Sequence, residues 1–371
     1  MKFLLLFLWT VAGVAAAPLG LTVQDGVLTK DGCPWRGIGV NYFDCFLRTL
    51  KDSDDTSYEN GFRILAEHRI PFARFCATGF WPKDMALYQT NRTEYFRRLD
   101  GVVRSAQEHG IGLVPSLFWH FACVPDLVAE PVGQWGNPQS KTHAWMRQYV
   151  REVVTRYRHS PAIWAWEFGN EYSLQASLPN AKEHRAPIHP ALGTAAARSE
   201  RDDLTFETVR VAFAEFARTV RELDPDRLIV TGDSFLRPSA WHQEHENNWK
   251  RDTKEQFQEM LAKVNPDPVS AISLHLYEED RQRLAWAAEL SRRLKKPLFI
   301  GEFGVAGEGP ETIARFQRLL QIIRELDVPI AALWVFDYKQ QQKSFNVRPD
   351  NSRRYQLDAI VGFNRPTQPP P

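Results

Sequence analysis

Two glutamates each end a short apolar run of the kind that forms buried strands. Glu171 ends the run over residues 163–171, and Glu302 ends the run over residues 297–302. Ionisable groups at the ends of parallel strands meet at one edge of the sheet, where folds of this class carry their chemistry. Two carboxyl groups that face one bond are the minimal equipment for splitting a glycosidic bond. The pair therefore predicts acid–base chemistry on a sugar.

Two further polar residues, Asn170 and Arg74, are candidates to act with this pair of glutamates. Asn170 directly precedes Glu171, and an amide in that place can orient a sugar hydroxyl while the acid protonates the leaving oxygen. Taken alone, the Asn-Glu dipeptide favours a surface ion pair, but Glu302 at another strand end reverses this interpretation. Arg74 lies inside an otherwise apolar strand, where a guanidinium without a carboxylate partner is costly to bury. We expect Arg74 to hold Glu302 as an ionised nucleophile, with Glu167 as the structural alternative.

Three aromatic or imidazole positions complete the candidate set. His275 and Tyr277 are two residues apart, so their side chains leave one face of a strand, and the Tyr hydroxyl can donate to the nucleophile. Trp334, near the end of the last predicted strand, offers a flat apolar face to a pyranose ring, or packs in the core. His120 follows the third strand and is either a contact to sugar or an ordinary loop histidine.

The elements that must position these residues alternate along the chain. Short apolar runs are separated by segments with apolar residues at three- and four-residue spacing, which predicts strands alternating with amphipathic helices. The predicted strands are residues 37–41, 72–75, 112–117, 163–169, 228–232, 271–276, 297–302 and 330–336. The predicted helices are residues 57–68, 93–109, 141–159, 204–223, 253–264, 280–294 and 311–326.

Eight such units in about 350 residues predict an α/β fold, a closed (β/α)8 TIM barrel. An open doubly wound sheet is the alternative, but no Gly-x-Gly-x-x-Gly follows the first strand. Residues 21–33 read as a β-hairpin that turns at Asp25-Gly26 and ends at Asp31-Gly32, and we expect it to cap one end of the barrel. Long connections over residues 172–203, 233–252 and 337–354 would build the cleft.

The ends of the chain predict export. Residues 1–17 have the charged, apolar and small-residue regions of a secretory signal peptide, which implies a secreted protein, extracellular or periplasmic. An uncleaved membrane anchor is the alternative. Residues 18–364 would form a single domain, followed by a Pro-rich tail over residues 365–371.

Charge and cysteine content exclude several classes of partner. A net charge of +1, with acidic and basic residues interspersed, offers no footprint for nucleic acid or an anionic membrane. We therefore expect an uncharged carbohydrate partner, no stable membrane association and a monomer. Four cysteines are too few for a disulfide framework and leave three pairings open. No cofactor or metal is expected, and the cluster His242, His245 and Glu246 reads as a solvated loop.

Together, these residues resemble the signature of glycoside hydrolase family 5, the cellulase and mannanase family, over nearly the whole mature chain. The residues that carry it are Arg74, Asn170, Glu171, His275, Tyr277, Glu302 and Trp334. The resemblance implies that Glu171 is the acid/base and Glu302 the nucleophile of a retaining double displacement on β-mannan or β-glucan. The family's histidine after strand three maps to His120 only with a shift of about one residue. The run 165–171 resembles the mannanases more than the cellulases.

Two rival functions use the same scaffold. A catalytically silent barrel would bind carbohydrate without cleaving it, and a transglycosylase would pass the sugar to an acceptor other than water. Either would use aromatic subsites, and about three of seven loop aromatics are expected to line the cleft. These candidates are Tyr42, Phe43, Trp81, Trp119, Tyr172, Trp241 and Trp249.

Overall fold

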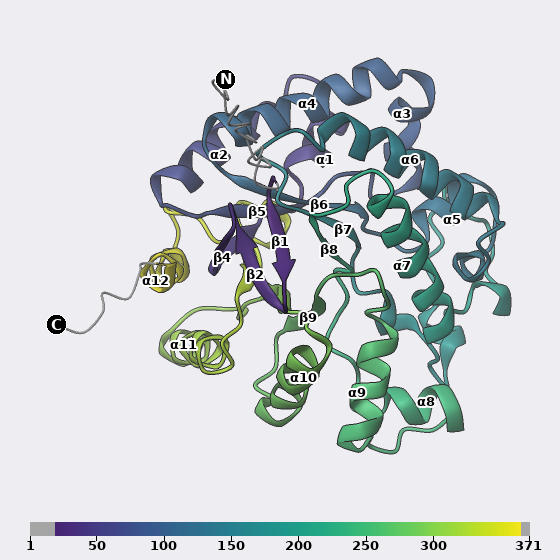
Figure 1. Cartoon of the computed structure of the whole chain (residues 1–371). Helices are drawn as coiled ribbons and strands as arrows, with labels where there is room; N and C mark the ends of the chain where they lie inside the picture. The colour runs from purple at the N-terminus through teal and green to yellow at the C-terminus, as the bar shows by residue number, and fades with distance from the viewer. Residues whose placement is uncertain (1–18, 365–371) are drawn as a thin grey trace, which may run out of the picture.

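The computed structural model describes residues 19–364, and its centre is a sheet of eight parallel strands surrounded by helices (Figure 1). The strands are β4 (Gly37–Asn41), β5 (Phe72–Cys76), β6 (Gly112–Phe118), β7 (Ala165–Gly169), β8 (Leu228–Val230), β9 (Ile272–Leu276), β10 (Leu298–Phe303) and β11 (Ile330–Leu333). All eight predicted strands are confirmed, with ends that differ by a few residues. The predicted signal segment 1–17 and the tail 365–371 lie outside the described residues.

The sheet closes into a barrel through serine contacts between its two edge strands. The strands pair in the order β8-β7-β6-β5-β4-β11-β10-β9. Between β8 and β9, the Ser270 amide donates to the Ile229 carbonyl at 2.9 Å, and the Thr231 amide donates to Ser273 Oγ at 3.1 Å. These bonds join the edges without a regular ladder. The predicted (β/α)8 barrel is therefore confirmed.

The seven predicted helices are also confirmed. They are α2 (Ser57–Glu67), α4 (Arg92–Glu108), α6 (Lys141–Tyr157), α7 (Phe206–Arg221), α9 (Lys254–Lys263), α10 (Arg281–Leu294) and α11 (Pro310–Glu325). Short polar residues start several of them: Ser140 Oγ accepts from the His143 amide, and Thr205 Oγ1 accepts from the Thr208 amide. No helix within residues 19–364 is long and apolar enough to cross a membrane.

Five further helices are absent from the sequence-based prediction. They are α1 (Cys45–Lys51), α3 (Ala86–Thr90), α5 (Cys123–Leu127), α8 (Ala240–Glu246) and α12 (Arg354–Asn364). Four of these have at most seven residues, which is too short for apolar periodicity to repeat over two turns. Helix α12 begins where the predicted last loop ends. The long connection after β7 contains only short 3-10 turns.

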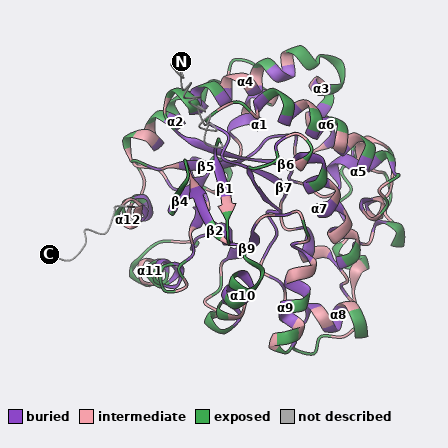
Figure 2. Cartoon of the chain, viewed as in Figure 1, coloured by how far each residue is buried: buried purple, intermediate pink, exposed green. Residues whose placement is uncertain are grey.

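The interior of the barrel has an apolar layer below a polar one. Along β5, β6 and β7 the residues Phe72, Val114 and Ala165 point inward, and two positions further along each strand the same face carries Arg74, Ser116 and Glu167. Figure 2 shows the strands buried and the outer faces of the helices exposed. Since parallel strands start at the same end, the change from apolar to polar occurs at one height and separates the packed base from the reactive edge.

A three-stranded sheet closes the base of the barrel, at the centre of Figure 1. It contains β1 (Leu21–Gln24), β2 (Val27–Lys30) and β3 (Cys33–Pro34). The expected hairpin, its turn at Asp25-Gly26 and its end at Asp31-Gly32 are confirmed, and that second turn leads into a third strand, β3. Leu21 and Leu28 belong to the same buried cluster as Phe72 and act as a plug.

We expect Leu28→Ala to lower the free energy of unfolding by about 2–4 kcal/mol, because it removes buried contacts and leaves a cavity under the barrel. Chemical unfolding measures this value. Val27→Ala is the matched control, since the neighbouring side chain is 47% exposed and its loss should cost little. Equal losses in the two variants would contradict the plug.

Candidate active site

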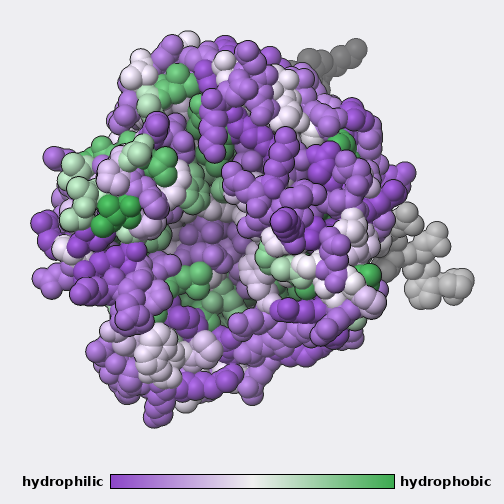
Figure 3. Space-filling view, turned by 180° about the vertical axis from the view of Figure 1, so that it is seen from behind, coloured by the Kyte–Doolittle hydropathy of each residue, from purple (hydrophilic) through white to green (hydrophobic). Residues whose placement is uncertain are grey.

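The carboxyl ends of the strands surround a cavity of about 320 Å³. Figure 3 shows the face of the molecule opposite the hairpin, with a hollow near its middle. The cavity is lined by Phe43, Phe80, Trp119, Asn170, Glu171, Tyr277, Glu302, Trp334, Tyr338 and Gln341. Polar groups that could act on a bond therefore share one space with aromatic side chains.

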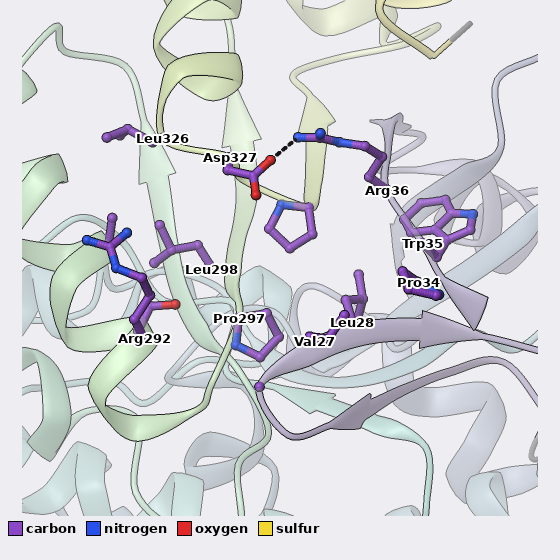
Figure 4. A pocket seen from close by; sticks show the side chains of 14 residues that line it. Val27, Leu28, Pro34, Trp35, Arg36, Arg292, Pro297, Leu298, Leu326 and Asp327 are labelled. Carbon is purple, nitrogen blue, oxygen red and sulfur yellow. Dashed lines mark hydrogen bonds and ion pairs between the residues drawn. The ribbon is translucent and has the colours of Figure 1, made fainter. Parts of the chain in front are cut away.

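A second cavity, of about 330 Å³, lies at the other end of the barrel, between the hairpin and α10 (Figure 4). Its walls are mostly apolar, and its one carboxylate, that of Asp327, accepts a hydrogen bond from Arg36 at 2.7 Å. No second acid lines this cavity. It therefore lacks the groups for acid–base chemistry, and the cavity at the carboxyl ends is the candidate site.

Backbone geometry brings the two carboxyl groups together. Glu171 follows β7 in the left-handed region, with φ 54°, and its amide donates to the Gly232 carbonyl at 3.1 Å. Glu302 lies in β10, where the pairing with β9 shifts register between Ile300 and Glu302. Oxygens of Glu171 and Glu302 and a ring nitrogen of His275 all lie within 4.8 Å of one another. Local departures from regular strand geometry thus direct both carboxyl groups toward the same cavity.

The Arg74 guanidinium is fully buried and joins the acids to the strands around them. Its Nε donates to both oxygens of Glu167, at 2.8 and 2.9 Å, and its Nη1 donates to Oε1 of Glu302 at 2.8 Å. Nη1 also donates to Oδ1 of Asn41 at 2.9 Å, and Nη2 donates to Oδ1 of Asn170 at 2.8 Å. Of the two expected partners, Glu302 and Glu167, Arg74 thus binds both at once.

The two acids have different surroundings. Both oxygens of Glu302 accept hydrogen bonds, one from Arg74 and the other from the Tyr277 hydroxyl at 2.6 Å. Glu171 instead contacts Nδ1 of His275 at 2.8 Å, and burial lowers the pKa of that ring to about 4. Burial also raises the pKa of Glu171, more than the charge of Arg74 lowers it. Donors therefore occupy both oxygens of Glu302, whereas Glu171 is poised to carry a proton.

Seven of the eight predicted site residues contact one of the two acids or line the cavity. They are Arg74, Asn170, Glu171, His275, Tyr277, Glu302 and Trp334. His120 does not line the cavity. Its ring lies against Phe80 and Trp81, at centroid distances of 5.0 and 4.9 Å, and burial lowers its pKa to about 4. The neighbouring Trp119 lines the cavity instead of His120. The Arg74 guanidinium lies over the Trp119 ring, with Cζ of Arg74 4.3 Å from the ring centroid.

The aromatic wall is only partly predicted. Phe43 and Trp119 are the two loop candidates that line the cavity, whereas Tyr42 and Tyr172 are fully buried. Trp81, Trp241 and Trp249 lie outside it. Sequence reasoning did not find the lining residues Phe80, Tyr338 and Gln341. Their only sequence signal is their position in the loops after β5 and β11. The composition of those loops does not show which side chains line the cavity and which pack in the core.

The cluster His242, His245 and Glu246 is not the solvated loop that the sequence predicts. These residues lie on α8, and His242 is buried with its Nδ1 2.8 Å from Oδ1 of Asp252. Within residues 19–364, Glu171, His275 and Glu302 form the one group of metal-ligating side chains close enough to share an ion. All four cysteines are unpaired thiols.

Comparisons with known proteins agree with this geometry. The profile of the family described as Cellulase (glycosyl hydrolase family 5) matches residues 28–340. A protein named probable mannan endo-1,4-beta-mannosidase F, from Aspergillus flavus, is 36% identical over 262 residues, which is 66% of this chain and 48% of the relative. A second, probable mannan endo-1,4-beta-mannosidase A-1 from Aspergillus terreus, is 36% identical over 90 residues, 23% of each chain. The chain thus spans about half or less of these relatives.

Among solved structures, an endo-1,4-beta-mannanase from Rhizomucor miehei is similar, with a TM-score of 0.66 and 14% identity. The match covers 92% of this chain and 99% of that one. At this identity the similarity establishes the fold.

Replacing the central cation tests the electrostatics of the site. We expect Arg74→Met to lower the free energy of unfolding by about 3–5 kcal/mol at neutral pH, because Glu167 and Glu302 lose their counter-ion. The loss should shrink toward about pH 5, where protonation removes the uncompensated charge. Urea unfolding at both pH values measures it. Arg36→Met is the control, since its ion pair with Asp327 is exposed and worth less than about 1 kcal/mol. A loss independent of pH would refute this account.

Proposed function

Because the chain belongs to glycosyl hydrolase family 5, we propose that it hydrolyses β-linked mannan with retention of configuration, with Glu171 as acid/base and Glu302 as nucleophile. The observation that carries the proposal is the distance between the acids, whose nearest oxygens lie within 4.8 Å. Retention needs carboxyl groups about 5–5.5 Å apart, whereas inversion leaves about 6.5–9.5 Å for a water molecule. The spacing therefore favours direct attack by one acid.

In the first displacement, Glu302 attacks the anomeric carbon while Glu171 gives its proton to the leaving oxygen. Hydrogen bonds from Arg74 to Oε1 and from the Tyr277 hydroxyl to Oε2 fix the orientation of the Glu302 carboxylate for this attack. Asn170 is fixed by Arg74 at 2.8 Å and presents its amide to the cavity, where it can bind a sugar hydroxyl. The product is a glycosyl ester of Glu302 and a free sugar end.

In the second displacement, the deprotonated Glu171 takes a proton from water, which attacks the same carbon and releases Glu302. Nδ1 of His275, neutral at neutral pH, lies 2.8 Å from Oε1 of Glu171 and can steady the carboxylate between the two roles. Trp334 lines the cavity and hydrogen-bonds through Nε1 to Gln341, so its ring is fixed for contact with a pyranose face. Charge is conserved, because one carboxylate becomes neutral as the other ionises.

Mannan, rather than glucan, is proposed on the names of the relatives, which are mannan endo-1,4-beta-mannosidases. The signal-like residues 1–17 support export of the protein, as a polymer outside the cell would require. No cofactor is needed for the steps above.

A panel of mannan, glucomannan, mixed-linkage β-glucan and cellulose tests the proposal by release of reducing sugar. We expect the protein to cleave mannan, and Glu302→Ala to lower the rate by about 10³-fold or more, because the nucleophile is lost. Glu278→Gln is the control, since that side chain follows Tyr277 but is 76% exposed. A Glu302→Ala variant as active as the wild type would exclude the assigned nucleophile. Binding of a polymer without cleavage by either protein would favour a silent carbohydrate-binding barrel.

The proton donor is tested by pH. Activity should fall as pH rises through the pKa of Glu171, since only the protonated acid can donate, and burial places that pKa above its ordinary value of 4.5. In Glu171→Gln we expect this fall in activity at higher pH, the alkaline limb of the pH profile, to disappear. The variant should retain more activity on an aryl mannoside, whose leaving group needs no proton, than on mannan. The measurement is kcat/KM against pH on both substrates, and an unchanged limb in the variant would rule Glu171 out.

A further inference from the structure

Glu167 is a buried acid that the two displacements do not use. It lies on the inward face of β7, four residues before Glu171, and is 0% exposed. Gly232, just after the neighbouring strand β8, leaves room for it, because a Cβ at that glycine would come within 2.7 Å of the Glu167 carboxyl carbon. Burial raises the pKa of Glu167 to about 7, although the charge of Arg74 and a hydrogen bond with Ser116, which lies beside it on β6, both lower it. The fold thus accommodates a buried acid whose only charged partner within residues 19–364 is Arg74.

The geometry of Arg74 links Glu167 to the catalytic pair. A guanidinium is planar, and its donors point in fixed directions. Glu167 receives the Nε donor, while the two remaining nitrogens donate to Glu302 and Asn170, each at 2.8 Å. Orienting one edge of this rigid group therefore orients the other donors. A displacement of the Glu167 carboxylate would move the hydrogen bonds that hold the nucleophile and the sugar-facing amide.

The titratable groups around Arg74 come from five elements. Arg74 itself is on β5, Glu167 and Glu171 come from β7 and the residue after it, and Glu302 is on β10. His275 on β9 and the adjacent Tyr277 are uncharged at neutral pH, because burial lowers the pKa of the histidine to about 4 and raises that of the tyrosine. Asp233 follows β8, where burial raises its pKa to about 6 and its Oδ1 accepts from the Ser173 amide.

Because both of its oxygens accept from Nε of Arg74, the ionised form of Glu167 shares that cation with the nucleophile. With its charge present, only part of the field of Arg74 acts on Glu302 and Glu171. Without that charge, the full cation would favour the ionised form of both acids. Ionised Glu171 cannot donate a proton, and an overstabilised Glu302 is a weaker nucleophile.

We propose that Glu167 is a positioning residue: it fixes the orientation of Arg74 and offsets its charge, and so sets the pH range over which Glu171 and Glu302 act. The inference rests on the proposed function of those two acids. It assigns a role to a side chain that cannot touch the substrate from its buried place below the cavity.

Glu167→Gln tests the proposal, because the amide keeps the length of the side chain and removes its charge. We expect kcat on mannan or an aryl mannoside to fall by about 10–100-fold while KM changes less than about twofold. Both limbs of the profile of kcat/KM against pH should move to lower pH, by about one unit. Glu167→Asp keeps the charge but shortens the reach, so kcat should fall while both limbs stay near their wild-type positions.

Asp126→Asn is the matched control. Asp126 is likewise fully buried and accepts two hydrogen bonds of 2.7 Å from Arg198, but it does not line the cavity. This variant should melt at a lower temperature and keep the wild-type pH profile below its transition. If Glu167→Gln behaves in the same way, its role is structural and the proposal is wrong.

Two outcomes separate this inference from the proposed function. Loss of activity in Glu302→Ala together with unshifted limbs in Glu167→Gln would overturn the inference alone, whereas an active Glu302→Ala would overturn the function. If Glu167→Gln does not fold, Glu167→Asp decides: a lower kcat with unmoved limbs supports the positioning role, and a raised KM with unchanged kcat contradicts it.

Discussion

The burial of one guanidinium constrains the whole reactive end of this barrel. Arg74 is completely removed from solvent, so each of its donors must find an acceptor within the protein. Those acceptors come from three regions far apart in the sequence: Asn41, the neighbours Glu167 and Asn170, and Glu302. A barrel that failed to bring these strands together would leave a charge buried without a partner. Folding and assembly of the site are therefore the same event.

This arrangement also explains how two neighbouring acids acquire different states. Glu302 has donors on both oxygens, while Glu171 lies beside an imidazole that burial keeps neutral. At the opposite end of the barrel, the sheet of β1, β2 and β3 buries Leu21 and Leu28 and closes the interior against water. The packed base makes the polar layer rigid, so the directions of its hydrogen bonds are fixed before any sugar arrives.

The cavity wall shows where reasoning from the sequence was weakest. Phe43 and Trp119 were expected at the cleft and line it, yet Tyr42, next to Phe43, is fully buried. Adjacent loop aromatics thus divide between the core and the site according to backbone path, which no periodicity encodes. Likewise, Trp119 lines the cavity whereas His120, the next residue, does not. The long loops placed Phe80, Tyr338 and Gln341 at the cavity without a sequence signal.

The sequence by itself determined the strands, seven of the helices and the acids at strand ends, because strand and helix periodicities and the cost of burying charge act locally. It also required that Arg74 have a carboxylate partner. Only the tertiary structure decided that this partner is two carboxylates at once, and that the register shift in β10 and the left-handed backbone at Glu171 bring the acids within 4.8 Å. Those distances depend on how separate strands pack around one cation, which is a property of the closed barrel.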